Sequence, residues 1–231
     1  MARINKSTLT RLEIIRAASQ EFLENGYSVT TAKKICSKLN MSTGNLTFYF
    51  PTKEHLLAAL VEIGCDFQRE MMEREAADGF SSIMGICLEL TAMAVMCEED
   101  PVAKDFYIAS YTSPLCLEVV RKRDAARAKE LFREYCPDWT DTQFLEAETL
   151  VSGIEYATLM TTQHSAPLEA RIAGAMELIL GIYNIPEETR RLKVQKVLAM
   201  DYRAIGRQML CEFKQYVKEA NEESVLKLLK A

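Results

Sequence analysis

All six prolines of this 231-residue chain stand where a helix would begin or end, and no other feature restricts the fold as strongly. A proline inside a helix removes a backbone hydrogen bond and costs about 3 kcal/mol, so unbroken helices are confined to the intervals between these residues. Asp100-Pro101 and Ser113-Pro114 each place a capping residue directly before a proline at the first helical position. No segment alternates apolar and polar residues as a half-buried strand does. We therefore predict an all-α fold.

The predicted helices divide the chain into an N-terminal head and a larger body. A capping box at Thr10 and Glu13 predicts where the first helix begins, and Gly26 predicts where it ends. Beyond the head, helices are predicted over 52–76, 80–98, 101–111, 114–135, 140–163, 165–183 and 186–220. No flexible linker interrupts 52–76, so this connecting helix is expected to transmit a tilt between head and body. We assign residues 1–55 to the head and 56–231 to the body.

Within the head, the stretch from Thr30 to Lys53 indicates two short helices joined by a tight turn. Thr31 can cap the first helix, since its hydroxyl accepts a hydrogen bond from a backbone amide of the first turn. Asn40 suits the left-handed conformation that ends a helix, and either Ser42 or Thr43 can cap the second one. The stretch therefore predicts a helix-turn-helix.

The same region carries a series of short motifs in a fixed order. They are Phe22-Leu23-Glu24-Asn25-Gly26-Tyr27, Thr30-Thr31, Ile35-Cys36, Met41-Ser42-Thr43-Gly44, Leu46, Tyr49-Phe50 and Thr52-Lys53-Glu54. Over about Thr10 to Leu60 this series resembles the amino-terminal DNA-binding domain of the TetR family of transcription regulators. Two positions depart from the family pattern: Thr47 stands where a tyrosine is usual, and Cys36 stands where a small alanine is usual. The first bears on the DNA contact made there, and neither affects the expected fold.

The resemblance implies which residues read DNA bases. The second helix of a helix-turn-helix enters the major groove. By match to the family pattern, Thr43, Asn45, Thr47 and Tyr49 would face the groove or its walls. Asn45 could read an adenine edge, and Thr47 could offer its hydroxyl to a base or its methyl group to a thymine.

Phosphate contacts are expected from Thr31, Tyr49 and Lys53, with Lys33 reaching either a base or the backbone. The alternative is that Tyr49 only packs and that Lys33 is a solvated charge. The distribution of charge agrees with a DNA-binding head. Residues 1–55 contain eight lysines and arginines and four acids, a net charge of +4, so the remaining residues carry −9 of the formal total of −5. A basic head on an acidic body turns the head toward phosphate.

Sequence-specific binding requires two heads, because a single one buries a small interface and reads few bases. Two-fold symmetry would then match a pseudo-palindromic operator in double-stranded DNA. The segments 140–163 and 171–183 are more apolar than one surface helix requires. We predict that they form a four-helix homodimer interface; the alternative is that they are buried within one chain.

The segment from Ile83 to Cys97 is apolar apart from a single charge, Glu89. A helix that is apolar all round is buried, and a buried carboxylate requires a partner. In the TetR family the corresponding part of the body holds a ligand cavity. Glu89, Tyr107, Tyr111 and Tyr156 are therefore candidate walls for an unknown small-molecule effector. The alternative for Glu89 is a position at the helix surface or a pair with an arginine.

Other classes of function find little support in the sequence. The seven cysteines are odd in number and lack metal-ligand spacing, which is typical of small core residues in a reducing cytosol. The two histidines lie in no catalytic or metal motif, and no phosphate-binding glycine loop is present. We expect no enzyme activity and no cofactor. No apolar run reaches the ~20 residues of a membrane-spanning helix, so we expect a cytoplasmic protein without a membrane partner.

The function expected from these features is that of a ligand-responsive, homodimeric transcription repressor. Two alternatives remain open. The first is a DNA-binding regulator without a small-molecule sensor, which a fully packed body would favour. The second is a helical interaction protein that has lost DNA binding, which Thr47 alone favours.

Overall fold

The computed structural model describes residues 6–77 and 81–219, and within these ranges the chain forms eleven α-helices and no strand. The helices are α1 (Lys6–Asn25), α2 (Ala32–Leu39), α3 (Thr43–Tyr49), α4 (Lys53–Ala77), α5 (Ser82–Glu99), α6 (Pro101–Thr112), α7 (Pro114–Leu131), α8 (Asp141–Leu159), α9 (Leu168–Ile182), α10 (Glu187–Ala199) and α11 (Tyr202–Glu219). The predicted all-α class is confirmed.

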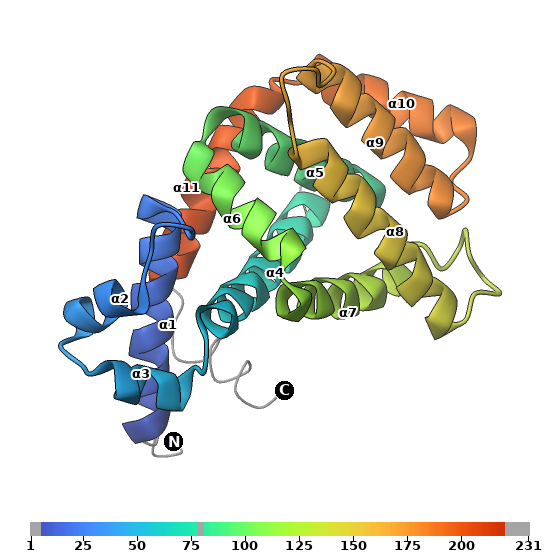
Figure 1. The fold of residues 1–231 in the computed structure, drawn as a ribbon. Coiled ribbons are helices and arrows are strands. Elements are labelled where there is room, and N and C mark those ends of the chain that lie inside the picture. Colours follow the sequence, from blue (N-terminus) through green and yellow to red (C-terminus); the bar gives the residue numbers. More distant parts are fainter. Residues whose placement is uncertain (1–5, 78–80, 220–231) are drawn as a thin grey trace.

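The head consists of α1, α2 and α3, and it packs directly on the body. Figure 1 shows these three helices at one end of the molecule, α8, α9 and α10 at the other, and α4 running between the two ends. Phe22, Ile35 and Leu46 of the head are buried in one apolar cluster with Leu57 and other residues of α4. The same cluster continues into α6, α7 and α11. Head and body therefore share a core.

The last described helix, α11, returns along the body toward the head. It packs on α5 and also contacts α1 and α4. Gly206 allows the close approach to α5, because a Cβ atom there would lie 2.7 Å from Cβ and Cγ1 of Val95. A second apolar cluster joins α5, α7, α8, α9 and α10 at the end far from the head. The centre of the body thus lies between two packed regions.

Two helix boundaries differ from the predictions. The first helix begins at Lys6, and Thr10 lies inside it, where its hydroxyl donates to the Lys6 carbonyl at 3.1 Å instead of capping the N-terminus. The predicted helix over 186–220 is two helices, α10 and α11. Asp201 separates them, since its carboxylate accepts the amide of Ala204 at 3.0 Å and so caps α11.

The cysteines are dispersed through the fold as free thiols, and only Cys211 on α11 is exposed. Burial raises the pKa of Cys87 and Cys97 to about 12. Across residues 6–77 and 81–219, no helix combines the length and the apolar character needed to cross a bilayer.

Candidate functional site

The turn between α2 and α3 is fixed by side-chain caps at both helices. The Thr31 hydroxyl accepts the Lys34 amide at 3.2 Å, and Asn40 ends α2 in the left-handed conformation with φ of 50°. Ser42 caps α3, accepting the amide of Asn45 at 3.1 Å. The predicted roles of Thr31 and Asn40 as caps are confirmed, and of the two candidates for the second cap it is Ser42 that serves. A capped turn of this kind holds α3 at a defined angle to α2.

One face of α3 projects into solvent. Leu46 is buried in the head, whereas Thr43, Asn45 and Thr47 are exposed. The Thr47 hydroxyl donates to the carbonyls of Thr43 and Gly44, both at 3.1 Å, so it is turned back onto its own helix. The hydroxyl proton is thus used within the helix. Of the two contacts considered for Thr47, the one from its methyl group to a thymine is therefore the one that remains.

Phe48, which was not among the predicted DNA contacts, is 79% exposed on α3. Its ring meets the half-buried ring of Tyr49 edge to face, with centroids 5.2 Å apart. Periodicity could have identified it, because Leu46 and Phe50 are one turn apart and buried, which leaves Phe48 on the opposite side of the helix. An exposed aromatic ring on this face widens the surface that α3 presents.

The lysines of α2 differ in their surroundings. Lys34 and Lys38 form ion pairs with Glu21 of α1 at 2.8 and 3.2 Å, and the hydrogen bond from Lys34 is the main cause that lowers the pKa of Glu21. Lys33 is exposed beside the turn. Unlike Lys34 and Lys38, Lys33 is therefore exposed on α2 without an ion pair to Glu21.

Lys53, a predicted phosphate contact, is engaged inside the head. Its ammonium group donates to the carbonyls of Tyr27 and Thr30 at 3.0 and 3.1 Å and lies 4.0 Å from the centroid of the Tyr27 ring. These carbonyls belong to the loop between α1 and α2. Lys53 therefore joins the first turn of α4 to the loop that carries Thr31, the other predicted phosphate contact on this side.

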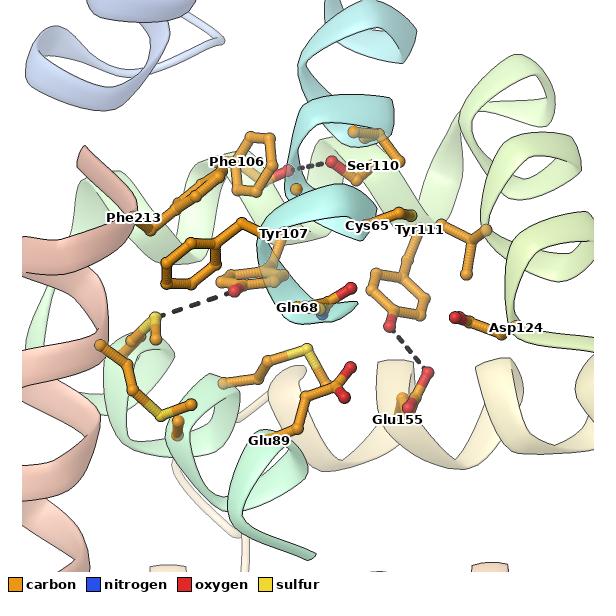
Figure 2. Close-up of a pocket in the computed structure, with 18 of the residues that line it drawn as sticks. Cys65, Gln68, Glu89, Phe106, Tyr107, Ser110, Tyr111, Asp124, Glu155 and Phe213 are labelled. Atoms are coloured by element: carbon orange, nitrogen blue, oxygen red, sulfur yellow. Dashed lines mark hydrogen bonds between the residues drawn. The ribbon is translucent and has the colours of Figure 1, made fainter. Parts of the chain in front are cut away.

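A cavity lies in the centre of the body between α4, α5, α6, α7, α8 and α11 (Figure 2). The space between its atoms, including the mouth, is about 730 Å³, of which about 60 Å³ is open to the centre of a water molecule. Its walls are largely apolar, with Phe106 and Phe213 at one end and carboxylates at the other. Since one water requires roughly 10–15 Å³ by the second measure, the cavity has room for about four to six waters.

Three of the four residues predicted for a ligand site lie in this cavity. Glu89, Tyr107 and Tyr111 line it, whereas Tyr156 is half-buried on α8 and is not among the lining residues. The neighbouring Glu155 takes that place. Adjacent residues on a helix point about 100° apart, so Tyr156 is directed away from the space that Glu155 faces.

Two of the carboxylates at the polar end of the cavity, those of Glu89 and Asp124, share one cation. The Arg127 guanidinium binds both oxygens of Glu89, at 2.8 and 3.2 Å, and also Asp124 at 3.1 Å. Glu89 thus pairs with an arginine, which was one of the alternatives for it. On α8, Glu155 accepts the Tyr111 hydroxyl at 2.7 Å.

Burial changes the ionisation of these carboxyls. Desolvation raises the pKa of Asp124 to about 6 and, together with the nearby charge of Asp124, raises that of Glu148 to about 7. Desolvation raises the pKa of Glu155 well above its usual range, and Asp124 adds to this effect. Glu148 accepts a hydrogen bond from the buried Tyr183 hydroxyl. Burial thus shifts the ionisation of Asp124, Glu148 and Glu155 toward higher pH.

The helix α6 touches both the cavity and the head. It directs Tyr107 and Tyr111 into the cavity (Figure 2). Near its start, the Asp105 carboxylate accepts the Ser28 amide at 2.8 Å and the Ser28 hydroxyl. It also lies where a side chain on Gly26, which has φ of 104°, would collide with it. A movement of α6 at the cavity would therefore also move the loop that precedes α2, through the contact between Asp105 and Ser28.

The predicted dimer helices expose apolar and small residues. Leu150 on α8 and Leu178 on α9 are 56% and 61% exposed. Gly153 and Gly174 have open space where a side chain would be. Other apolar residues of α8, such as Phe144, are buried within the chain. Burial within the chain accounts for one face of α8, and the exposed leucine lies on another.

Comparison with known proteins connects the head to a family. Residues 14–60 match the family model described as bacterial regulatory proteins, tetR family. The HTH-type transcriptional regulator QacR of Staphylococcus aureus is 33% identical over 63 residues, which are 27% of this chain and 34% of QacR. The match therefore spans about a third of that relative's length.

Two solved structures share the fold over most of the chain. RolR, determined without ligand, has a TM-score of 0.61 at 17% identity and covers 79% of this chain and 95% of its own. Thermus thermophilus FadR, described as a TetR family transcriptional repressor in complex with lauroyl-CoA, has a TM-score of 0.56 at 21% identity, covering 77% and 96%. At these identities the likeness shows the arrangement of the helices.

Proposed function

We propose that this chain, which carries the DNA-binding domain and the helical fold of the TetR family of transcription regulators, is a homodimeric repressor that binds a pseudo-palindromic operator and responds to a small molecule. The observation that supports DNA binding best is the capped turn at Ser42 with an outward-facing α3, within the segment that matches the family model. We retain residues 1–55 as the DNA-binding domain and 56–231 as the regulatory domain.

DNA recognition would use the open face of α3. Asn45 is free to meet an adenine edge, and the outward methyl group of Thr47 suits contact with a thymine. Phe48 adds apolar surface beside them. Thr43, Tyr49 and Thr31 lie at the margins of this face, and Lys33 supplies a cation for a phosphate. For Lys53 we propose an indirect role, since its ammonium group holds the loop next to Thr31.

The homodimer would form through the open faces of α8 and α9. Leu150 and Leu178 are large apolar side chains exposed on these helices, and Gly153 and Gly174 permit close approach of a second copy. A four-helix contact between copies would bury both leucines. Two heads would then meet half-sites about 34–36 Å apart or at a multiple of that distance.

A ligand would act by favouring one of two positions of the heads. The presence of a cavity favours a ligand sensor over the alternative of a fully packed body. Because the free space in the cavity is small, a ligand would have to widen it. Three helices connect it to the head. α4 lines the cavity and begins at Lys53, and α6 contributes Tyr111 to the cavity and Asp105 to the contact with Ser28. α11 lines the cavity with Phe213 and packs on α1. The ligand-bound form would hold the heads at a spacing that no longer fits the operator.

The test is binding of the full chain to the DNA that flanks its own gene, measured at several salt concentrations. Tight binding to a palindromic site, weakening steeply with salt, is the expected result. Asn45→Ala should cost about 1–3 kcal/mol on the true site and little on scrambled DNA, whereas Lys33→Ala should weaken both and reduce the salt slope by about 1.

A matched control is Thr142→Ala, at an exposed position on α8, compared with Thr47→Ala on α3. Only the second should change the preference among operator sequences. Equal binding of the wild-type chain to operator and scrambled DNA would contradict the proposed function.

A further inference from the structure

We propose that the cavity binds an organic cation, an amphiphilic molecule whose ammonium or amidinium group lies beside Glu155 and whose apolar part extends between α4, α5 and α6. This inference rests on the ligand-responsive function proposed above and specifies the chemical class of the ligand.

The ionisable groups around the polar end of the cavity are predominantly acidic. α5 contributes Glu89, α7 contributes Asp124 and Arg127, and α8 contributes Glu148 and Glu155. Arg127 is already engaged by Glu89 and Asp124. The two carboxyls on α8 are each held by a phenol hydroxyl instead of a cation. Of the three carboxyls that line the cavity, Glu89 and Asp124 are paired with Arg127 and Glu155 is not, so a cationic ligand would find an acid without a cationic partner there.

Glu155 is the carboxyl best placed for a ligand. Figure 2 shows it at the end of the cavity, with Asp124 beside it and Gln68 of α4 across the space. The Tyr111 hydroxyl binds one of its oxygens, Oε2, and Glu155 keeps accessible surface toward the cavity. Gln68 has no hydrogen-bond partner among the described residues, so its amide oxygen is available to an N–H group. The two side chains together form acceptors on opposite sides of one position.

The remaining walls suit a cation with an apolar body. The rings of Tyr107 and Tyr111 offer electron-rich faces, and an ammonium group within about 6 Å of such a ring is attracted to it. Met93 and Met96 line the apolar part, and the Tyr107 hydroxyl lies 3.7 Å from the Met96 sulfur. Thioether side chains adjust their shape readily, which allows a narrow cavity to widen around a ligand.

Other ligand classes fit this site less well. An anion would meet three carboxyls and no lysine, arginine or histidine among the described residues that line the cavity. A neutral ligand would leave the acidic excess unchanged. A metal ion requires several oxygens converging on one point, and within 6–77 and 81–219 no group of acidic, histidine or cysteine side chains is arranged to hold one.

Binding of a cation should displace a proton. In the empty cavity burial holds the pKa of Glu155 well above its usual range, which favours the protonated carboxyl. A cation beside it favours the ionised form, and the proton is released to solvent when the ligand binds. The affinity for a permanent cation should therefore increase as the pH rises.

The experiment compares three probes that share one phenyl ring: 2-phenylethylammonium, the neutral 2-phenylethanol and the anion phenylacetate. Their binding to the full-length protein is measured by isothermal titration in two buffers of different ionisation enthalpy. We expect the cation to bind about 10-fold or more tighter than the alcohol, with phenylacetate weakest, and with net proton release for the cation alone.

Two variants with the same change of charge separate the site from general electrostatics. Glu155→Gln keeps an acceptor for Tyr111 and should reduce binding of 2-phenylethylammonium about 10-fold, abolish proton release and leave 2-phenylethanol within about 2-fold. Glu118→Gln, at an exposed position on α7, should bind all three probes as the wild type does. A preference for the cation that survives Glu155→Gln, or a preference for the alcohol or the anion, would overturn the proposal.

Operator binding is measured on the same preparation, so that the two proposals can fail separately. A chain that binds its operator but none of the three probes is a regulator for which the assignment of an organic cation is wrong. A chain that binds the cation but no specific DNA would retain the ligand class and lose the proposed function.

Discussion

Replacing Glu148 by glutamine should make the protein more stable at high pH and leave it nearly unchanged at low pH. Glu148 is 5% exposed on α8 and accepts a hydrogen bond from the Tyr183 hydroxyl. Burial, reinforced by the charge of Asp124, raises its pKa from 4.5 to about 7. Glutamine is nearly isosteric, keeps an acceptor for the tyrosine and cannot ionise.

The magnitude follows from the change in pKa. The carboxyl of Glu148 contributes stability that is fully present below its unfolded pKa of about 4.5 and is lost as the pH rises through its folded pKa of about 7. At 1.36 kcal/mol for each pKa unit, the loss amounts to about 3 kcal/mol above pH ~8. For a chain of this length that corresponds to a Tm difference of about 6–12 °C.

The assay is thermal or urea unfolding of wild type and Glu148→Gln from pH ~5 to ~9, at one protein concentration because the proposed dimer would also add to stability. The difference between the two should be small near pH ~5 and largest above pH ~8. Glu118→Gln, at an exposed position on α7, should follow the wild-type curve. Parallel curves for Glu148→Gln and wild type, or a less stable variant at pH ~8, would refute the reasoning.

Three further substitutions test other parts of the fold. Gly206→Ala should reduce the free energy of unfolding by about 1–3 kcal/mol in urea denaturation, because the new Cβ atom meets α5 at 2.7 Å. Leu178→Glu should yield a monomer in sedimentation experiments, whereas Leu192→Glu, at an exposed site on α10, should leave the dimer intact. Asp105→Ala should accelerate hydrogen exchange at the Ser28 amide by about 10-fold, reflecting the loss of about 1.4 kcal/mol of hydrogen bonding; unchanged exchange would rule out the contact.

Local signals in the sequence were sufficient for the head. Thr31 and Asn40 determine the ends of α2 through their own hydrogen bonds and backbone preferences, which depend on neighbours within four residues. Pro101 and Pro114 begin α6 and α7 as predicted, and Asp100 caps α6, but the prediction that Ser113 caps α7 was wrong, because its side chain makes no capping hydrogen bond. Exposure of Phe48 also follows from helical periodicity, although it was not inferred.

The cavity depended on packing that the sequence does not express. Glu89 was identified because it is the one charge in an apolar helix, but its partner Arg127 lies 38 residues later, on a helix whose orientation follows from the fold. Tyr156 and Glu155 differ by a single helical step, and a small error in the orientation of α8 exchanges one for the other. The break at Asp201 lacks both glycine and proline, so the cap that starts α11 was indistinguishable from an ordinary helical aspartate.

The contact of Lys53 with the loop before α2 sets the scale of movement that could control DNA binding. α4 has 25 residues and is therefore about 37 Å long at 1.5 Å per residue. Because Lys53 holds the carbonyls of Tyr27 and Thr30, the loop and the start of α4 move as one rigid unit. A rotation of α4 by only about 5° around its far end would carry the head roughly 3 Å along the DNA, close to the 3.4 Å rise of one base pair. In the proposed dimer, a small change in the width of the cavity would be enough to shift α3 of each copy by one base-pair step.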